Sequence, residues 1–159
     1  MTDTPPATAA EIATMDRLID RALEAAEDGG KAGISAAIMR GDTLLAIAEN
    51  EVHLHHDPTR HAEIVAMSRA TRALADPDLS GCTLLTTLQP CEMCLSAMRF
   101  AGIKRVIFAA TKPNVELSKY FAFPDLDLTD FDRADHDGFL AIGGVQEDRI
   151  VHLYAKAED

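Results

Sequence analysis

The first patterned stretch of the chain predicts an amphipathic helix. Thr8 and Glu11 have the spacing of a capping box, in which a hydroxyl and a carboxylate each accept a backbone N–H at the start of a helix. Behind them, apolar residues recur three or four positions apart, as on one helix face: Ile12, Met15, Ile19, Ala22, Leu23 and Ala26. We expect the helix to stop before Gly29-Gly30.

The next apolar stretches predict strands. The segments GISAAIM (33–39) and TLLAIA (43–48) flank Arg40-Gly41-Asp42. Two apolar runs around a short turn that contains glycine are typical of a β-hairpin. Further along, CTLLTT (82–87) and KRVIFAA (104–110) predict a third and a fourth strand.

Two further helices alternate with these strands. One begins near Arg60-His61 after a polar loop rich in histidine (53–59), and ADPDLSG (75–81) ends it. Its apolar face consists of Ile64, Met67, Ala70 and Leu74. The other follows Pro90 and runs from about Cys91 to Ala101. This alternation predicts a layered α/β domain in which helices cover both faces of one sheet.

The remaining stretches are less patterned. The polar segment 111–137, which contains KYFAFP, shows no pattern that fixes an element boundary. IVHLYA (150–155) fits either a strand or a short helix. Neither an internal repeat nor a linker interrupts the chain. We therefore predict one domain over residues 1–159, with residues 1–8 as a mobile leader.

Charge and composition narrow the class of protein. The 15 Lys and Arg residues against 26 Asp and Glu residues give a net charge of −11. Because nucleic-acid binders neutralise phosphates with Lys and Arg, a general nucleic-acid partner is not expected. No apolar run approaches the roughly 18–20 residues of a membrane span, so no membrane association is expected. The chain start lacks the features of a signal peptide, which favours a cytoplasmic location.

His61, Cys91 and Cys94 form a candidate zinc site. The two cysteines are spaced C-x-x-C, so at a helix start both sulfurs point to one side, and His61 opens the other helix. One imidazole and two thiolates leave the fourth tetrahedral position to water, as in catalytic zinc sites. Helix N-termini favour thiolates over thiols. Zinc lowers the pKa of its bound water to about 7, which gives a hydroxide nucleophile at neutral pH.

Glu63 is the candidate catalytic residue. It lies two positions beyond His61, near a zinc-bound water but not needed to hold the metal. A carboxylate there can take the proton of the water and hand it to a departing amine. The arrangement H-x-E…P-C-x-x-C is the pattern of zinc nucleobase deaminases, in which hydroxide attacks the ring carbon that bears the amine and ammonia leaves.

Other interpretations of these residues stay open. A C-x-x-C pair alone also fits a structural zinc half-site or a redox pair, and a His-Ala-Glu sequence alone arises by chance. A thioredoxin-like pair is not expected together with His-x-Glu on a separate helix. The main alternative is therefore a non-catalytic zinc protein, in which Glu63 has no role. Cys82 begins an apolar strand and is expected to be buried packing.

At these residues the sequence resembles the cytidine deaminase-like superfamily, in the branch of bacterial guanine deaminase, tRNA adenosine deaminase and fungal cytosine deaminase. The similar text is DPTRHAEIVAM (57–67) and TLLTTLQPCEMCLSAMRFAGIKRVIFAA (83–110). The resemblance implies a three-layer α/β/α sandwich around a five-stranded mixed sheet, assembled as a homodimer. It also implies one zinc ion per chain on His61, Cys91 and Cys94, with Glu63 as the proton shuttle.

The resemblance also implies substrate contacts. Asn50 matches the position at which relatives contact the base with an amide, although it also fits a turn at a strand end. Backbone amides near Ala62 and Cys91 would complete the pocket. Asp125, in FPD, is the nearest match to an acidic residue that handles the purine in guanine deaminases, and it equally fits a solvated loop. Gln89 stands where many relatives have Glu, which leaves its role open.

Two further groups have open roles. The aromatic residues Tyr120, Phe121 and Phe123 either line the pocket and stack on a flat ring or pack a C-terminal helix against the sheet. The polar loop contains three histidines, His53, His55 and His56. They either form a second metal site, gate the pocket or are solvated side chains, and the solvated state is favoured.

The resulting hypothesis is a zinc-dependent hydrolytic deaminase of a small nucleobase or nucleoside. Guanine, and thus purine metabolism, is favoured over cytosine, because the Asn50-to-His61 spacing and the DPT sequence look most like guanine deaminases. A tRNA adenosine deaminase comes next, and the net charge of −11 argues against it. A non-catalytic zinc protein is the last alternative.

Overall fold

The computed structural model describes residues 6–27, 33–122, 125–136 and 138–155. Helix α1 (Ala9–Glu27) begins at the predicted capping box. The backbone N–H of Thr8 donates to Oε2 of Glu11 at 2.8 Å, and that of Glu11 donates to Oγ1 of Thr8 at 3.2 Å. Thr8, which the sequence placed in a mobile leader, is therefore the residue that caps α1, while residues 1–5 lie outside the described residues.

The sheet has five strands in the order β2-β1-β3-β4-β5. The strands are β1 (Ser35–Arg40), β2 (Thr43–Glu49), β3 (Cys82–Leu88), β4 (Arg105–Ala110) and β5 (Leu140–Ile142). Strand β1 is antiparallel to both β2 and β3, whereas β3, β4 and β5 are parallel to one another. Gly41 in the β1–β2 turn has a φ of 57°, a left-handed value that glycine adopts without a steric cost. The predicted five-stranded mixed sheet is confirmed.

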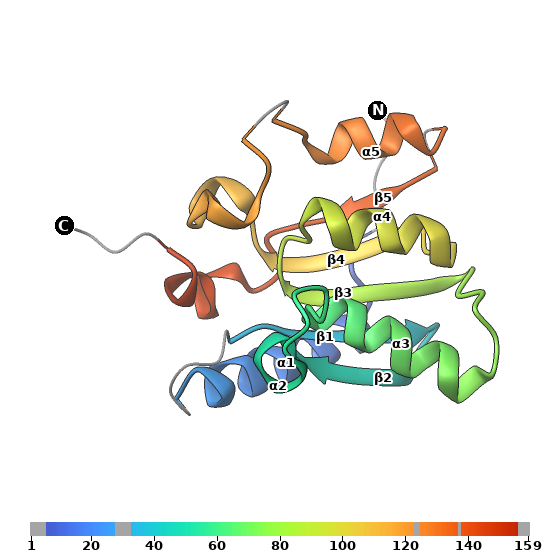
Figure 1. The fold of residues 1–159 in the computed structure, drawn as a ribbon, viewed down its shortest axis with the longest axis horizontal. Helices are drawn as coiled ribbons and strands as arrows, with labels where there is room; N and C mark the ends of the chain where they lie inside the picture. Colours follow the sequence, from blue (N-terminus) through green and yellow to red (C-terminus); the bar gives the residue numbers. More distant parts are fainter. Residues whose placement is uncertain (1–5, 28–32, 123–124, 137, 156–159) are drawn as a thin grey trace.

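Helices cover both faces of this sheet. Every residue of β3, and every residue of β1 except Arg40, is buried, as expected for strands packed on two sides. Helices α3 (Ala62–Leu74) and α4 (Glu92–Ala101) lie side by side on one face, and α1 covers the other (Figure 1). This arrangement is the predicted three-layer α/β/α sandwich. Cys82 is 2% exposed in β3, which confirms its expected burial.

Several elements differ from the sequence predictions. The predicted loop 53–59 begins with a short helix, α2 (Val52–His55), whose start is held by the Asn50 side chain and not by any apolar periodicity. The described residues of segment 111–137 form the 3-10 turns η1 (Lys112–Asn114) and η2 (Leu117–Lys119) and helix α5 (Leu128–Ala134).

The C-terminal part supplies the fifth strand. Strand β5 is only three residues long and is defined by its pairing with β4, so its own sequence pattern is too short to predict it. IVHLYA, which fitted a strand or a short helix, forms the 3-10 turn η4 (Val151–Leu153) after η3 (Glu147–Arg149). Among the described residues, no helix combines the length and apolar character needed to cross a bilayer.

Candidate active site

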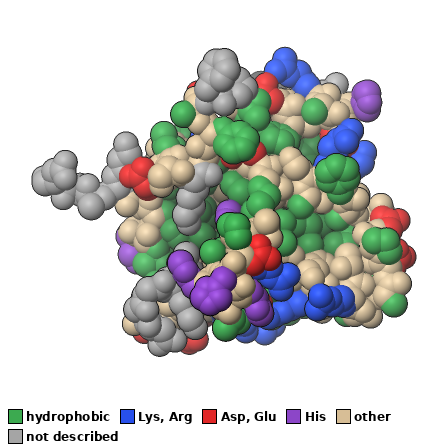
Figure 2. Space-filling view, viewed as in Figure 1, with side chains coloured by type: hydrophobic (Ala, Val, Ile, Leu, Met, Phe, Trp, Pro, Cys, Tyr) green, Lys and Arg blue, Asp and Glu red, His purple; other side chains and the backbone are tan. Residues whose placement is uncertain are grey.

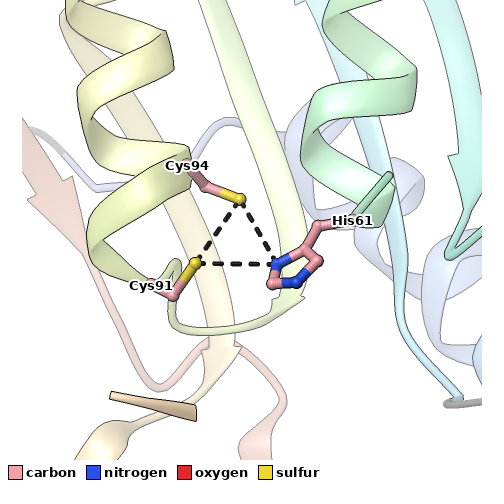
Figure 3. Close-up of side chains that lie close together, drawn as sticks. All are labelled: His61, Cys91 and Cys94. Carbon is pink, nitrogen blue, oxygen red and sulfur yellow. Dashed lines mark hydrogen bonds between the residues drawn. The ribbon is translucent and has the colours of Figure 1, made fainter. Parts of the chain in front are cut away.

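The three predicted zinc ligands meet between the starts of two helices (Figure 3). His61 is the N-cap of α3 and Cys91 is the N-cap of α4, and both have extended backbone conformations. Cys94 follows in the first turn of α4. The Sγ atoms of the cysteines lie 3.7 Å apart, and Nδ1 of His61 lies 3.6 Å from Sγ of Cys91 and 3.8 Å from Sγ of Cys94.

These distances fit a zinc ion. With Zn–S bonds of about 2.3 Å and Zn–N bonds of about 2.0–2.1 Å, tetrahedral geometry places two sulfurs about 3.8 Å apart and a sulfur and a nitrogen about 3.6 Å apart. The observed triangle matches both values. One imidazole with two thiols is also a donor set that zinc prefers in proteins. The geometry therefore suits a zinc ion with three protein ligands.

The electrostatics of the thiols support the same conclusion. Hydrogen bonding from the Cys94 thiol, aided by His61, lowers the pKa of Cys91 to about 4. The same bond, together with burial and the Glu63 carboxylate, raises the pKa of Cys94. One thiolate therefore forms readily in the protein alone. A cation bound between the sulfurs would also favour the thiolate form of the second cysteine, because metal binding releases ligand protons.

Glu63 lies beside this triangle. It occupies the first turn of α3 and is 4% exposed. The Thr86 hydroxyl donates to its Oε1 at 3.0 Å, and Oε2 lies 3.6 Å from Sγ of Cys94. Burial raises the pKa of the Glu63 carboxyl. The side chain is thus held so that one oxygen faces the candidate metal ligand Cys94 while the other is fixed by Thr86 of β3.

A cavity of about 300 Å³ opens onto these residues. His61, Glu63 and Cys91 form one side of it. Three apolar side chains also line it, one directly before β1, one in α2 and one at the end of β3: Ile34, Val52 and Leu88. The volume is at the lower end of the range for small-ligand sites, which run from about 300 to 1,000 Å³.

Most of the chain matches a known protein family. Residues 11–136 match the model of the MafB19-like deaminases. The chain belongs to the MafB19-like deaminase family. The predicted relationship to the cytidine deaminase-like superfamily is thereby confirmed.

Curated relatives of this deaminase-family chain include two kinds of enzyme. It is 36% identical over 99 residues to guanine deaminase of Bacillus subtilis. The aligned residues cover 60% of this chain and 64% of the relative. It is 38% identical over 90 residues to the tRNA-specific adenosine deaminase of Aquifex aeolicus. This alignment covers 57% of this chain and 60% of the relative. The chain thus spans less than two thirds of the length of either relative.

Solved structures extend the similarity over more of the chain. Guanine deaminase from Nitrosomonas europaea superposes with a TM-score of 0.77 at 26% identity, over 95% of this chain and 86% of that one. A tRNA:A34 deaminase superposes with a TM-score of 0.73 at 26% identity. The superposition covers 87% of this chain and 96% of that one. A further structural neighbour is a mutant protein in complex with 8-azaguanine. It superposes with a TM-score of 0.75 at 26% identity, over 89% of this chain and 80% of that one.

Of the predicted substrate contacts, Asn50 lines the cavity. Its Oδ1 accepts the backbone N–H of Val52 at 3.0 Å, so Asn50 forms the turn at the strand end as well. Because the oxygen is engaged, the amide nitrogen is the donor that this side chain offers a ligand. Ala62 is buried at the first position of α3 and is not among the residues that line the cavity.

Asp125 lies on the surface. Its side chain is 80% exposed and pairs with Nζ of Lys112 at 3.3 Å. It is not among the residues that line the cavity, which agrees with the alternative of a solvated loop. A contact between Asp125 and a purine stays a prediction.

The aromatic segment divides between cavity and surface. Tyr120 lines the cavity and is 8% exposed, and its hydroxyl donates to the backbone oxygen of Gln89 at 2.7 Å. Phe121 is 58% exposed, and Phe123 lies outside the described residues. Gln89 also lines the cavity, and its Oε1 accepts the backbone N–H of Lys112 at 2.8 Å.

The histidines of α2 have separate surroundings. His53 lines the cavity, and Nε2 of His55 lies 3.5 Å from Oε1 of Glu51. His56 ends α2 in a left-handed conformation. Figure 2 shows histidine side chains gathered over the position of α2. Within the described part of the chain, the one group of His, Cys and acidic residues with metal-ligand spacing is His61, Cys91 and Cys94.

Thr86 and Val52 were not singled out by the sequence. Thr86 belongs to an apolar strand pattern, in which a threonine carries no signal of a contact 23 positions away. Val52 directly precedes the predicted loop 53–59. The one signal in the sequence that could have placed it near the pocket is its position two residues after Asn50, a predicted substrate contact.

Proposed function

We propose that the protein catalyses the zinc-dependent hydrolytic deamination of a small nucleobase or nucleoside, with a guanine-like purine as the favoured substrate. The observation that carries the proposal is the position of Glu63. Its buried carboxylate lies 3.6 Å from Sγ of Cys94, beside three donor atoms with zinc spacing. A structural zinc site would need no carboxylate there, and burying one carries a desolvation cost.

The residues of the chain divide the chemistry between them. His61, Cys91 and Cys94 would hold zinc, which when bound acts as a Lewis acid and lowers the pKa of water to about 7. Glu63 takes a proton from the attacking water and delivers it to the exocyclic amine. A C–O bond forms at the ring carbon, the C–N bond breaks, and ammonia leaves. Thr86 holds Oε1 of Glu63, so Oε2 is the oxygen that carries the proton.

The cavity supports a flat, polar ring as substrate. Ile34, Val52 and Leu88 offer apolar surface, and Asn50 offers an amide N–H to an acceptor on the ring. Relatives with the same fold are bound to 8-azaguanine and to 2,6-diaminopurine. Guanine is therefore favoured and cytosine is the next candidate.

A tRNA adenosine substrate is the second candidate function. It is supported by the tRNA-specific adenosine deaminases among the relatives. The net charge of −11 opposes it, because an RNA backbone is bound through Lys and Arg.

The test is ammonia release by the zinc-loaded protein with guanine, cytosine, adenine, their nucleosides and an adenosine-containing tRNA. One substrate should be turned over. Glu63→Ala should keep its zinc and lose at least about a hundredfold in rate, since general acid–base catalysis contributes about 10²–10⁴. Asp125→Asn, tested with the same substrate, shows whether this carboxylate contacts the base. Unchanged turnover in Glu63→Ala would contradict the proposal.

A further inference from the structure

The segment after β4 is hydrogen-bonded to Gln89 and Glu92, which lie on either side of Cys91 in the sequence. The backbone N–H of Lys112 donates to Oε1 of Gln89 at 2.8 Å, and the hydroxyl of Tyr120 donates to the backbone oxygen of Gln89 at 2.7 Å. The backbone N–H of Phe121 donates to Oε1 of Glu92 at 2.9 Å. These three hydrogen bonds, which we call the latch, join segment 112–121 to the loop that carries a zinc ligand.

The latch places the ring of Tyr120 in the cavity wall. Tyr120 is 8% exposed and lines the cavity together with His61 and Glu63. Nζ of Lys112 lies 5.3 Å from the ring centroid, within the range of a cation–π contact. The neighbouring Phe121 is 58% exposed, so only one of these two aromatic residues is directed to the site. Each of these contacts limits the positions that the Tyr120 ring can adopt.

Forming the latch requires the burial of the Glu92 carboxylate, which carries a desolvation cost. This residue stands between Cys91 and Cys94 and is 7% exposed. Its Oε1 accepts the Phe121 N–H, but its Oε2 is buried without a hydrogen-bond partner among the described residues. A carboxylate in such a position is disfavoured by desolvation, and packing alone would be served better by an apolar side chain. The bond to Phe121 is the contact that accounts for an acceptor at this position.

We propose that Tyr120 is a specificity-determining residue, whose ring is the wall against which the planar base packs, and that Gln89 and Glu92 are positioning residues. This inference rests on the proposed function. Because the latch is anchored on both sides of Cys91, the wall is fixed relative to the zinc ligands. The wall therefore sets how far the ring of a substrate lies from Glu63.

The test measures binding of 8-azaguanine, guanine and cytosine by calorimetry to zinc-loaded protein that carries Glu63→Ala, so that no turnover interferes. In this background Tyr120→Leu should bind its ligand roughly ten- to a hundredfold more weakly, which is the range of base–aromatic stacking. Zinc content should stay at one per chain. Phe121→Leu, which changes the adjacent exposed aromatic residue, should bind as the parent does. Where Tyr120→Leu does not fold, Tyr120→Met repeats the test with a flexible apolar side chain.

The positioning role has its own variants. Glu92→Ala should weaken binding about tenfold although Glu92 does not line the cavity, and Glu92→Gln, which keeps an acceptor for Phe121, should restore it. Parent-like binding by a folded, zinc-loaded Tyr120→Leu would overturn the assignment of Tyr120. A failure of Glu92→Gln to restore binding would overturn the positioning role. If the parent protein binds none of the three bases, the proposed small-base function fails, and this inference fails with it.

Discussion

The hydroxyl of Thr86, on β3, donates a 3.0 Å hydrogen bond to Oε1 of Glu63, on α3. Both residues are buried, with Thr86 at 0% and Glu63 at 4% exposure. This bond links the sheet to the carboxylate that we propose as the proton carrier. It leaves Oε2 on the side of Cys94, where a proton would be exchanged.

Replacing Thr86 by valine tests this relationship. Valine has the same shape but no hydroxyl, so Oε1 of Glu63 loses its donor. We expect kcat to fall about ten- to a hundredfold, since a hydrogen bond to a charged group contributes about 1.5–3 kcal/mol. Zinc content should not change. The control is Thr87→Val, because the Thr87 hydroxyl contacts Tyr154 and the N–H of Ser35 and does not contact Glu63. A normal kcat in Thr86→Val would show that the bond has no catalytic role.

Metal removal should destabilise the protein. An ion that binds only the folded state at a thousandfold excess over its Kd stabilises by about 4 kcal/mol. For a chain of this size that corresponds to roughly 10 °C in Tm, so we expect a loss of this order with EDTA and recovery with zinc. Cys94→Ser should abolish the response. Cys82→Ala should keep one zinc per chain, because Cys82 lies outside the ligand group. A Tm that does not respond to EDTA would contradict a bound zinc.

The ion pair between Glu11 and Arg105 should make stability depend on pH. Burial raises the pKa of Glu11, but hydrogen bonds from Arg105 and Thr8 and the charge of Arg105 outweigh it and lower the pKa below its ordinary value. The stabilisation is therefore present above the unfolded pKa of about 4.3 and is lost as pH falls through the lower folded pKa. Glu11→Gln should cost about 2 kcal/mol at pH 7.

Denaturant unfolding between pH 3 and pH 7 checks this prediction. The difference between the parent protein and Glu11→Gln should begin to shrink as pH falls below the unfolded pKa of about 4.3, and it should vanish once pH falls below the lower folded pKa of Glu11. Asp20→Asn is the matched control, since Asp20 pairs with Arg149 on the surface and is 66% exposed. Its effect should stay below about 1 kcal/mol. A Glu11→Gln difference that is constant with pH would contradict the assigned role of the ion pair.

Salt separates a small substrate from RNA. For a free base we expect kcat/KM to change less than about twofold between 50 and 200 mM NaCl, because no phosphate is neutralised. An RNA substrate with several phosphate contacts would lose about 10³–10⁵ in affinity over the same range. A steep salt dependence would therefore favour the tRNA alternative in spite of the net charge of −11.

The expected homodimer can be tested at α4. Phe100 on this helix is 90% exposed, and Figure 2 shows hydrophobic side chains on the face formed by α3 and α4. If this face is the interface, Phe100→Glu should convert a dimer into a monomer in analytical ultracentrifugation. Leu54→Glu, at the 70% exposed Leu54 of α2, is the control. A monomeric parent protein would contradict the prediction. The cytoplasmic location also stays a prediction.

The sequence by itself determined the elements that carry local signals. The capping box of Thr8 and Glu11, the alternation of strands and helices up to Ala110 apart from the short helix α2, and the short glycine turn were all predicted. The candidate zinc ligands, which the structure brings together, could be identified for the same reason. Cys91 and Cys94 share one helix start, and His61 and Glu63 share another, so their spacing along the chain encodes their geometry.

Only the tertiary structure decided the rest of the cavity. Tyr120 enters its wall through a bond to Gln89, 31 positions away, while Asp125, five residues later, lies on the surface. Thr86 reaches Glu63 from a strand whose pattern signals burial alone. Such contacts join residues that are distant in sequence, and they depend on how strands and helices pack. No periodicity or short motif records that packing, which is why the candidate metal ligands could be read from the chain, whereas most of the pocket wall beyond Asn50 could not.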